Sequence, residues 1–556
     1  MTRSIIDPVT RIEGHLRVEM EVEGGVVTDA WVSGGCFRGM ELVVENRTPE
    51  DAAHIVQRIC GVCPVSHAHA SAIAAEKAYG ITIPNNARII RNLIEGGQFL
   101  HSHILWFYTL AALDYVNPIN ALNANVGDAL DLVEAAGTSC QSDLKALKEK
   151  LQTFANNGQL SIFSGGWFLD PEVAKEFTLG AELDLICTAH YIEALTMQSK
   201  ASEICALLGG KMPHVMTLVP GGTSFVPTEE KLDDLWSLVR EVRDWVKATM
   251  IPDTKAIAPA YKAALDFGKG CGRYIAWGVF EDPSFEMSKR YLPSGVIDEN
   301  LKLSEVNEDL IKEYVGHSWY VGDSDLNPRE GVTEPEYTEY YKGDTDVISD
   351  RYTWSKAPSY DGKPMEAGPF SRVLAAYLRG NKFVKTTLDG LMTDLGLSLG
   401  QLQSTLGRVA ARQVESLYVA ELMVEWVDEL IEAIKGGDSE YFRAPETITG
   451  SGTGFWEAPR GALYHTEHVD NGKITGYQII IPTTWNIAPR NKEGVRGPME
   501  QALIGTPVSN VEMPINALRT VHSFDPCTAC AVHVSEPATG KLSLIHISEP
   551  TRQAEI

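Results

Sequence analysis

RICGVC at 58–63 and DPCTAC at 525–530 each carry two cysteines three residues apart, Cys60 with Cys63 and Cys527 with Cys530. Cysteines at this spacing can direct both sulfurs at one ion, and thiolates select zinc, copper(I), iron or nickel. Because the two pairs lie near opposite ends of the chain of 556 residues, folding has to bring them together. The sequence therefore predicts a metal site of four thiolates built from both chain ends.

Structural zinc and a redox dithiol are the alternative interpretations of these cysteines. Zinc modules usually place two such pairs roughly 15 to 20 residues apart, whereas here more than four hundred residues separate Cys63 from Cys527. A redox dithiol needs a thioredoxin-like strand and helix around one pair, and neither pair has them. Both alternatives are disfavoured, and metal analysis would distinguish structural zinc.

Composition limits the partners of the chain. Acidic residues outnumber basic ones, 74 against 48, and the net charge of −26 disfavours nucleic acid or an anionic membrane surface. No apolar run is long enough to cross a bilayer, and residues 1–6 lack the regions of a signal peptide. If the protein is exported or attached to a membrane, we expect another chain to carry it there.

The other five cysteines do not form a pattern. They stand alone in the sequence, and we expect them to be buried small hydrophobic residues: Cys36, Cys140, Cys187, Cys205 and Cys271. An iron–sulfur cluster would need further clustered cysteines, so we expect none in this chain. Electrons released at the metal site must then leave through a different polypeptide.

The hydrophobic pattern predicts an α+β fold that is mainly α. Residues 16–33 alternate around Gly24-Gly25 and predict a hairpin, and a helix is expected from Pro49. Longer helices are expected at 85–114, 126–156, 180–209, 229–249, 384–395 and 400–435, an irregular excursion at 290–366, and strands at 447–490. We predict a core of bundled long helices with small peripheral sheets and the metal site at one end. No clear linker divides residues 1–533, which we expect to form a single domain.

Motifs along the chain carry a family resemblance. They are DPVTRIEGHLR at 7–17, FRGME at 37–41, RICGVCPVSH at 58–67, YTWSKAP at 352–358, EAPRG at 457–461, PTTWN at 482–486 and DPCTACAVH at 525–533. In this order they resemble the large subunit of nickel-iron hydrogenases. The resemblance implies reversible heterolytic oxidation of dihydrogen to protons and electrons, and we expect the uptake direction.

The resemblance also implies how the metals are held. Cys60 and Cys527 would bind nickel terminally, while Cys63 and Cys530 would bridge nickel to an iron that carries carbon monoxide and cyanide. Magnesium, with iron or calcium as alternatives, would be bound by Glu41, His533 and the backbone carbonyl of Ile479.

Two further residues are expected to act with Cys527 in catalysis. Arg460 would lie over the open metal position, where its fixed charge could polarise hydrogen or contact a cyanide, because a guanidinium is a poor base. Glu13 would receive a proton from a terminal cysteine and pass it outward. The alternatives are an ordinary ion pair for Arg460 and a solvated charge for Glu13.

Neighbouring residues would support the centre. The counterpart of His67 hydrogen-bonds a bridging sulfur, with a satisfied core histidine as the alternative. Thr483 would donate to a cyanide, Asp525 would pair near Arg460, and Pro459 precedes that arginine.

Ser102 stands where many relatives have aspartate beside the arginine, and Trp106 replaces a frequent histidine. APSYDG at 357–362 and GPFSR at 368–372 also depart from the common forms. We expect altered tuning rather than lost activity.

The tail suggests maturation by cleavage. In the family a protease cuts after the histidine that follows the last cysteine, which here lies between His533 and Val534. Residues 534–541 would be the propeptide, and nickel and iron insertion factors would act before the cut. Residues 542–556 are a suspected artefact, because LSLIHISEPTR at 542–552 looks like a translated sequencing adapter.

The resemblance also implies partners and rivals. The expected partners are an iron–sulfur small subunit and a membrane cytochrome b or another electron acceptor. These partners would hold the chain at a membrane. The periplasmic face is favoured over the cytoplasm. One rival is a hydrogen-sensing regulatory hydrogenase, which usually lacks a tail. The other is a noncatalytic subunit of the complex I type, which lacks the four cysteines.

Overall fold

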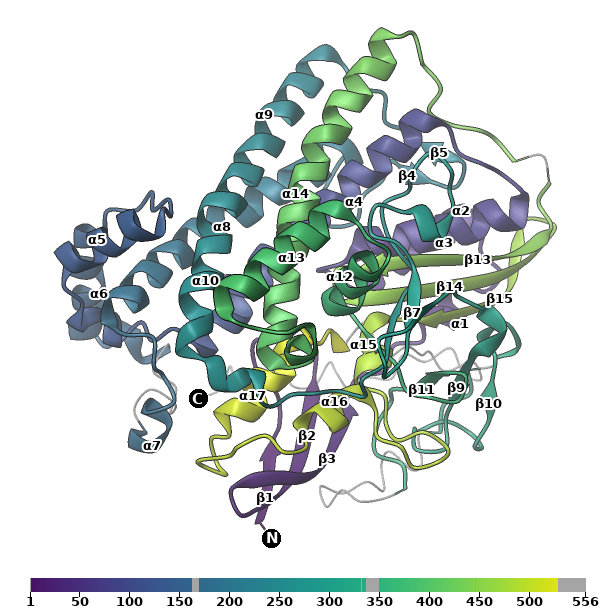
Figure 1. Ribbon diagram of the computed structural model, residues 1–556. Coiled ribbons are helices and arrows are strands. Elements are labelled where there is room, and N and C mark those ends of the chain that lie inside the picture. The colour runs from purple at the N-terminus through teal and green to yellow at the C-terminus, as the bar shows by residue number, and fades with distance from the viewer. Residues whose placement is uncertain (1, 163–169, 332, 337–349, 446, 529–556) are drawn as a thin grey trace, which may run out of the picture.

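The computed structural model describes residues 2–162, 170–331, 333–336, 350–445 and 447–528 (Figure 1). Within these ranges the chain is about half helical, and its strands form small separate sheets. Cys530, His533 and Val534, together with the expected propeptide and the suspected artefact, lie outside the described residues. The mainly helical α+β class that the sequence predicted is confirmed.

Long helices make up the largest part of the fold. These are α4 (Asn85–Leu105), α8 (Ala181–Gly209), α9 (Glu229–Trp245) and α14 (Thr405–Lys435). Helix α4 packs on α8 and α14, and α9 packs on the same two helices, so the four lie side by side (Figure 1). Each falls within a stretch that the sequence predicted as helix.

The single helix expected at 126–156 is wrong. The structure has α5 (Val126–Ala136) and α6 (Leu144–Asn156) instead. Gly137 ends α5 in the left-handed region with φ of 61°, where a glycine carries no Cβ penalty. Asp143 then caps α6 by accepting from the amides of Lys145 and Ala146. The glycine and the aspartate, with the polar residues between them, were the stop and start signals that the prediction of one helix overlooked.

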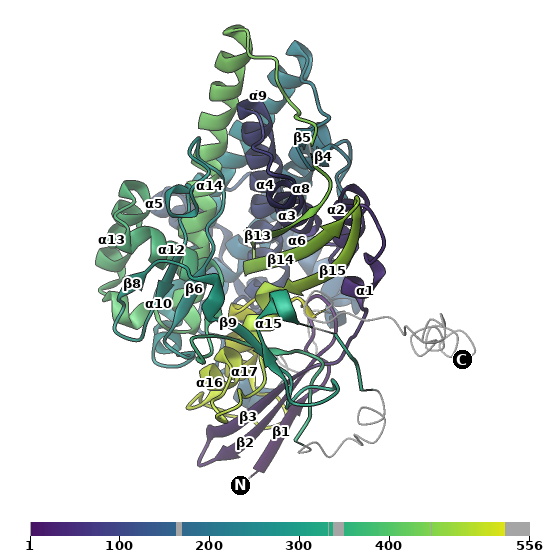
Figure 2. The same ribbon diagram turned by 90° about the vertical axis from the view of Figure 1, so that its right-hand side faces the viewer.

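The two ends of the chain share one core. The predicted hairpin is β2 (Leu16–Glu23) and β3 (Val26–Gly34), and β1 (Thr2–Ile6) adds a third strand beside β2. Helix α16 (Pro498–Leu503) packs on β3 and on α17 (Ile515–Ser523), near the foot of the molecule in Figure 2. Val18 and Val32 belong to the same buried cluster as Leu518 and Val521. Hydrophobic burial therefore brings the N-terminal sheet to the helix that precedes Cys527.

A close contact between a helix and a sheet positions the first cysteine stretch. Helix α3 (Pro64–Tyr79) follows Cys63 and lies on β13 (Gly450–Ala458), which pairs with β14 (Gly461–Asp470) and then β15 (Lys473–Ile480). A Cβ on Gly454 would stand 1.9 Å from the carbonyl oxygen of Ala70, and one on Gly452 would stand 2.0 Å from that of Ala74. Only glycine allows this approach, which fixes the start of α3 against the β13–β14 turn.

The remaining elements are shorter. The helices are α1 (Met40–Val43), α2 (Pro49–Ile55), α7 (Pro171–Ala174), α10 (Ile251–Ala260), α12 (Pro369–Leu378), α13 (Lys382–Leu395) and α15 (Pro482–Asn486). The strands are β4 (Leu218–Val219), β5 (Gly222–Thr223), β6 (Tyr274–Ala276), β7 (Gly295–Ile297), β8 (Leu303–Ser304), β9 (Ile311–Tyr314), β10 (Asp325–Leu326), β11 (Ala357–Tyr360) and β12 (Glu366–Ala367). The described part of 290–366 has only short strands and single turns of helix, as expected.

The isolated cysteines differ in burial. Cys187 and Cys205 are buried, as predicted, whereas Cys36, Cys140 and Cys271 are only partly buried. The prediction is therefore wrong for these three, because each lies in a connecting segment rather than inside a helix. Among the described residues, none of the helices combines the length and apolar character needed to cross a membrane.

Candidate metal centre

Three of the four predicted ligands converge in the structure. Cys60 ends a helical turn, Cys63 directly precedes α3, and Cys527 follows α17. The sulfurs of Cys60 and Cys527 are 3.3 Å apart, and the sulfurs of all three cysteines lie within 4.8 Å of one another. All three side chains are at most 1% exposed. The first cysteine pair and the first cysteine of the second pair thus meet, and Cys530 lies outside the described residues.

The donor set fits a soft metal. The amides of Val62 and Cys63 donate to the sulfur of Cys60 at 3.2 and 3.3 Å, so this loop favours a thiolate there. Several buried thiolates at such distances repel one another unless a cation lies between them. Nickel, iron and zinc accept thiolate ligands, and the geometry of three sulfurs does not by itself choose among them.

Glu13 lies against Cys527. A parallel bridge joins the backbones of these two residues, and the amide of Thr528 donates to the carbonyl of Glu13 at 2.8 Å. The sulfur of Cys527 is 3.0 Å from Oε2 of Glu13, which is only partly buried. The carboxylate of Glu13 therefore contacts the sulfur of Cys527, and the residue as a whole stays partly exposed to solvent.

Arg460 lies between an aspartate and a serine. Its Nη2 pairs with Oδ1 of Asp525 at 2.9 Å, and its Nη1 donates to Oγ of Ser102 at 3.3 Å. Burial acts to lower the pKa of Arg460, but the charges of Asp525 and of the three cysteines raise it well above its usual value. Arg460 is thus a permanent buried cation within electrostatic reach of the thiolates. The pairing of Asp525 near Arg460 is as predicted.

Sequence reasoning missed a second arginine at this place. Arg412, on α14, pairs with Oδ2 of Asp525 at 3.0 Å and lies 4.2 Å from the ring centre of Trp106. Burial lowers the pKa of Arg412 to about 10, while Asp525 opposes that shift. The sequence signal for this arginine was weak, because residues 405–435 contain charged residues along much of their length.

The supporting residues also lie at the centre. His67 is fully buried, and its Nδ1 is 3.2 Å from Nε2 of His465, whereas its Nε2 has no hydrogen-bond partner in the described structure. Burial lowers the pKa of His67 to about 4, so the ring is neutral. Thr483 accepts from the amide of Cys527 at 3.1 Å, and the carbonyl of Pro459 accepts from Arg372 at 2.8 Å.

The expected magnesium ligands are partly described. Glu41 is buried and accepts from the amide of Ile479 at 2.9 Å and from the hydroxyl of Thr333 at 2.5 Å. Lys356 lies 3.9 Å from the same carboxylate. Glu41 and Ile479 are therefore neighbours, as the resemblance implied, and His533 lies outside the described residues.

Comparison with known proteins decides the family. A family model described as nickel-dependent hydrogenase matches residues 38–533, and a model described as HoxL-like matches residues 4–33. This chain belongs to the nickel-dependent hydrogenase family. It is a hydrogenase, an oxidoreductase that acts on dihydrogen, and the thiolates of Cys60, Cys63 and Cys527 are the soft donors that a nickel–iron centre requires.

Individual relatives agree along nearly the whole length. The chain is 39% identical to the Hydrogenase-2 large chain of Escherichia coli K12, over 96% of this chain and 97% of that protein. It is 36% identical to the uptake hydrogenase large subunit of Rhodobacter capsulatus, over 98% and 97%. The as-isolated oxidised Ni-Fe-Se hydrogenase of D. vulgaris Hildenborough superimposes with a TM-score of 0.79 at 36% identity, covering 96% of this chain and all of that one. Position 527 is cysteine in this sequence, so its side chain carries sulfur rather than selenium.

Proposed function

We propose that this chain oxidises dihydrogen to protons and electrons in the uptake direction and passes the electrons to an iron–sulfur small subunit. The observation that carries the proposal is the convergence of three buried cysteines from both chain ends beside Arg460 and Glu13. The name of the Rhodobacter capsulatus relative, an uptake hydrogenase, supports the direction.

Four cysteines would hold the centre: Cys60 and Cys527 on nickel, with Cys63 and Cys530 bridging to an iron that carries carbon monoxide and cyanide. When bound, the metals supply a soft Lewis-acidic site that takes up dihydrogen and accepts its two electrons. His67 would donate from Nε2, the atom without a partner in the described structure, to a bridging sulfur. Thr483 would donate its hydroxyl to a cyanide.

In this proposal, Cys527 and Glu13 transfer protons and Arg460 supplies a fixed positive charge. The Cys527 sulfur would give its proton to Oε2 of Glu13 across the 3.0 Å contact, and the partly buried carboxylate would release it outward. Arg460 would hold a fixed positive charge over the open metal position, because its guanidinium does not titrate in the working range. Pro459, through its carbonyl, and Asp525, through its carboxylate, would fix the orientation of that arginine.

We infer the assembly from the family resemblance. Glu41, the carbonyl of Ile479 and His533 would bind magnesium, with iron or calcium as alternatives. A protease would cut between His533 and Val534 after metal insertion, leaving residues 1–533 as one domain with a long-helix bundle core and a centre closed by both chain ends. The small subunit and a cytochrome b or another acceptor would hold the enzyme at a membrane, with the periplasmic face favoured.

The test uses the processed enzyme purified with its partner. In Glu13→Gln we expect hydrogen oxidation to fall by roughly 100- to 10,000-fold, the usual contribution of a positioned proton acceptor. Infrared bands of carbon monoxide and cyanide should be unchanged, because the glutamine side chain keeps the shape of the glutamate and the metals remain bound. Glu23→Gln, an exposed carboxylate at the end of β2, is the matched control.

Two outcomes would contradict the proposal at different levels. Unchanged turnover in Glu13→Gln would remove Glu13 from the proton path and leave the metal centre in place. Absence of the infrared bands in processed wild-type protein that contains zinc would overturn the hydrogen-oxidising function, since the cysteines would then be structural.

A further inference from the structure

An apolar pocket lies on the side of the molecule that carries α6, between this helix, α8 and the residues 108–118 that follow α4 (Figure 1). It has a volume of about 270 Å³. Tyr108, Ala112 and Cys187 line it and are buried. None of its lining residues is among the predicted ligands or supporting residues of the metal centre, so the pocket is a separate feature of the fold.

One face of α6 forms a wall of the pocket. Leu147, Lys150, Leu151 and Phe154 line it, and residues three, four and seven apart lie on the same side of a helix. Leu147 and Leu151 are buried, whereas Lys150 is exposed. This face is therefore apolar over its inner part and carries one cation at its edge.

Small side chains keep the pocket open on the side of α8. Cys187 and Thr188 line it from α8, and Ala112 lines it from the segment after α4, where larger side chains would fill the space. Ile192 and Leu195, further along α8, also line the pocket but are still 41% and 42% exposed. The opening is thus bordered by large apolar side chains, which a bound apolar group would cover.

Two hydroxyl groups of the pocket already donate within the protein. Tyr108 donates to Oδ2 of Asp253 at 2.7 Å, and Thr188 donates to the backbone carbonyl of Asp184 at 2.6 Å. A polar group of a ligand would lose its water here with few partners to replace it, and such burial costs free energy. The interior of the pocket therefore favours a hydrocarbon chain.

Lys150 is the only charged residue among the described residues that line the pocket. Its Nζ lies 5.6 Å from the centre of the Phe154 ring, one helical turn away, so the ammonium is held at the opening. Within the described ranges of the chain this ammonium forms no hydrogen bond or ion pair. One cation beside an apolar interior matches a ligand that combines one anionic group with a hydrocarbon chain.

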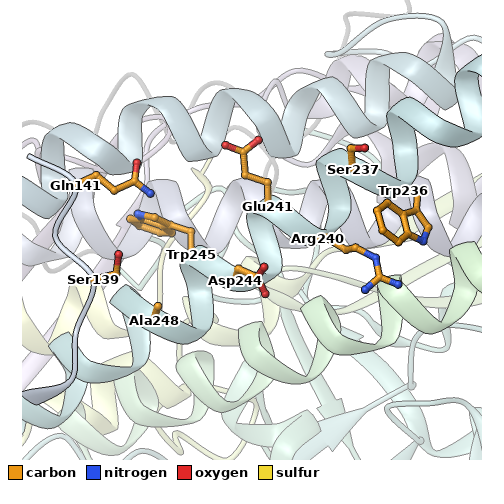
Figure 3. Close-up of a pocket in the computed structure, with 9 residues that line it drawn as sticks. All are labelled: Ser139, Gln141, Trp236, Ser237, Arg240, Glu241, Asp244, Trp245 and Ala248. Atoms are coloured by element: carbon orange, nitrogen blue, oxygen red, sulfur yellow. The ribbon is translucent and has the colours of Figure 1, made fainter.

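A neighbouring surface hollow lacks this selectivity. It has a volume of about 490 Å³, and Figure 3 shows Trp245 among the residues that line it. The rings of Trp245 and Tyr108 are 5.4 Å apart, so the hollow and the apolar pocket adjoin. The charged residues of the hollow carry both signs, and each has an opposite charge as its partner: Arg240 with Asp428, Glu241 with Lys200, and Asp244 with Arg243. The hollow therefore does not select an anion as the apolar pocket does.

We propose that the apolar pocket binds a fatty acid of medium length, with the carboxylate beside Lys150 and the hydrocarbon chain directed toward Ala112 and Cys187. A cavity of about 150 Å³ holds one benzene, which has six carbons, so a volume of about 270 Å³ has room for roughly ten carbons. Binding at this site does not depend on the proposed oxidation of dihydrogen, and the two can be tested separately.

The test is isothermal titration calorimetry of the processed enzyme, purified with its partner, with sodium decanoate below its micelle concentration. We expect one site for each copy of this chain. In the series from hexanoate to decanoate the affinity should rise about fourfold for each added methylene, the usual gain for burying one such group. From decanoate to dodecanoate the gain should stop, because the pocket is then full.

Four variants locate the site. Leu195→Asp places a negative charge at the opening and should weaken decanoate binding at least tenfold. Its matched control is Leu130→Asp, at a leucine of α5 that is 54% exposed and does not line the pocket, where the affinity should not change. Lys150→Gln should weaken binding about two- to fivefold, the usual effect of an exposed ion pair, while Lys145→Gln on the same helix leaves it unchanged. All four should oxidise hydrogen as the wild type does.

Three results would overturn the proposal, and the first two need no variant. One is the absence of one-to-one binding of decanoate, or an affinity that keeps rising beyond ten carbons, as expected for adsorption on the surface. Another is equal affinity for decanoate and decan-1-ol, which would remove the carboxylate from the recognition. The third is weaker binding in Arg240→Gln with no change in Lys150→Gln, which would move the ligand to the neighbouring hollow.

Discussion

Replacing the buried Arg372 is expected to lower the stability of the protein strongly. It lies on α12 with no exposed surface, and it makes a two-point contact with Glu415 at 2.6 and 2.7 Å. Its Nη1 pairs with Glu457 at 2.7 Å, and its two Nη groups donate to the carbonyls of Ala458 and Pro459 at 2.9 and 2.8 Å. One guanidinium thus satisfies two buried carboxylates and holds the turn that carries Arg460.

Replacing Arg372 with Met keeps the volume and removes the charge. Breaking a buried ion pair by removing one partner costs about 3–5 kcal/mol. Burial raises the pKa of Glu457 to about 7 even with Arg372 present, so without it this carboxyl stays protonated at neutral pH. Arg372 and its hydrogen bonds hold the pKa of Glu415 at about 2 against the effect of burial, so Glu415 carries most of the loss. We expect the free energy of unfolding to fall by about 4 kcal/mol.

The matched control is Arg379→Met on the same chain segment. Arg379 pairs with Glu305, whose side chain is 70% exposed, and an exposed pair is worth about 0.2–1 kcal/mol. The assay is the urea midpoint of the processed enzyme followed by tryptophan fluorescence, with the slope of the transition checked for equality. If Arg372→Met loses no more stability than Arg379→Met, the argument from buried charge is refuted. Turnover should also fall in Arg372→Met with nickel retained, since Pro459 loses its donor.

Three further outcomes are expected. In Cys60→Ser, nickel measured by metal analysis should fall below a tenth of wild type, since a hydroxyl is a harder and weaker ligand, while Cys36→Ser keeps its nickel. Burial first and Glu50 second raise the pKa of Glu467 from 4.5 to about 8, so the wild-type protein loses stability as the carboxyl of its unfolded state ionises above about pH 4.5. In Glu467→Gln, the free energy of unfolding relative to wild type should therefore rise with pH by up to about 5 kcal/mol and level off above pH 8 in urea titrations. A difference that does not change across this pH range would contradict the assignment. In Ser102→Asp, the infrared-detected midpoint potentials of the centre should become more negative than in Ser102→Asn, because an added buried negative charge favours the oxidised states.

Local signals predicted the elements but not all of their interruptions. The Gly24-Gly25 turn and the long apolar periodicities located β2, β3, α4, α8, α9 and α14. The break between α5 and α6 was missed although residues 137–143, GTSCQSD, are mostly polar and contain both a glycine stop signal and an aspartate start signal. β1 was missed because a short strand of five residues has too few alternating positions to stand out. The spacing of Gly450, Gly452 and Gly454 became meaningful only with α3 lying on them.

The residues of the candidate site also differ in how far the sequence alone could predict them. The cysteines, Glu13 and Arg460 lie in dense motifs, and a motif names residue types at fixed separations. Arg372 and Arg412 act through partners about forty to more than one hundred residues away in sequence, Glu415 and Asp525, and no local pattern encodes such pairs. Long-range ion pairs inside a core depend on how α12, α14 and the C-terminal segment pack, which a single sequence does not display.

The substitution at position 102 changes the charge balance at the centre. Two guanidinium groups, Arg460 and Arg412, share the single carboxylate of Asp525, each on its own oxygen. Ser102 supplies only a hydroxyl to Arg460, where an aspartate would add a second negative charge. The guanidinium of Arg412 lies over the ring of Trp106, which attracts the cation through its quadrupole but carries no net charge. A histidine at position 106 would instead place a titratable group there. The pair of departures therefore leaves a surplus positive charge beside the thiolates, which stabilises electron-rich states of the centre and should raise its reduction potential relative to a site with aspartate at this position.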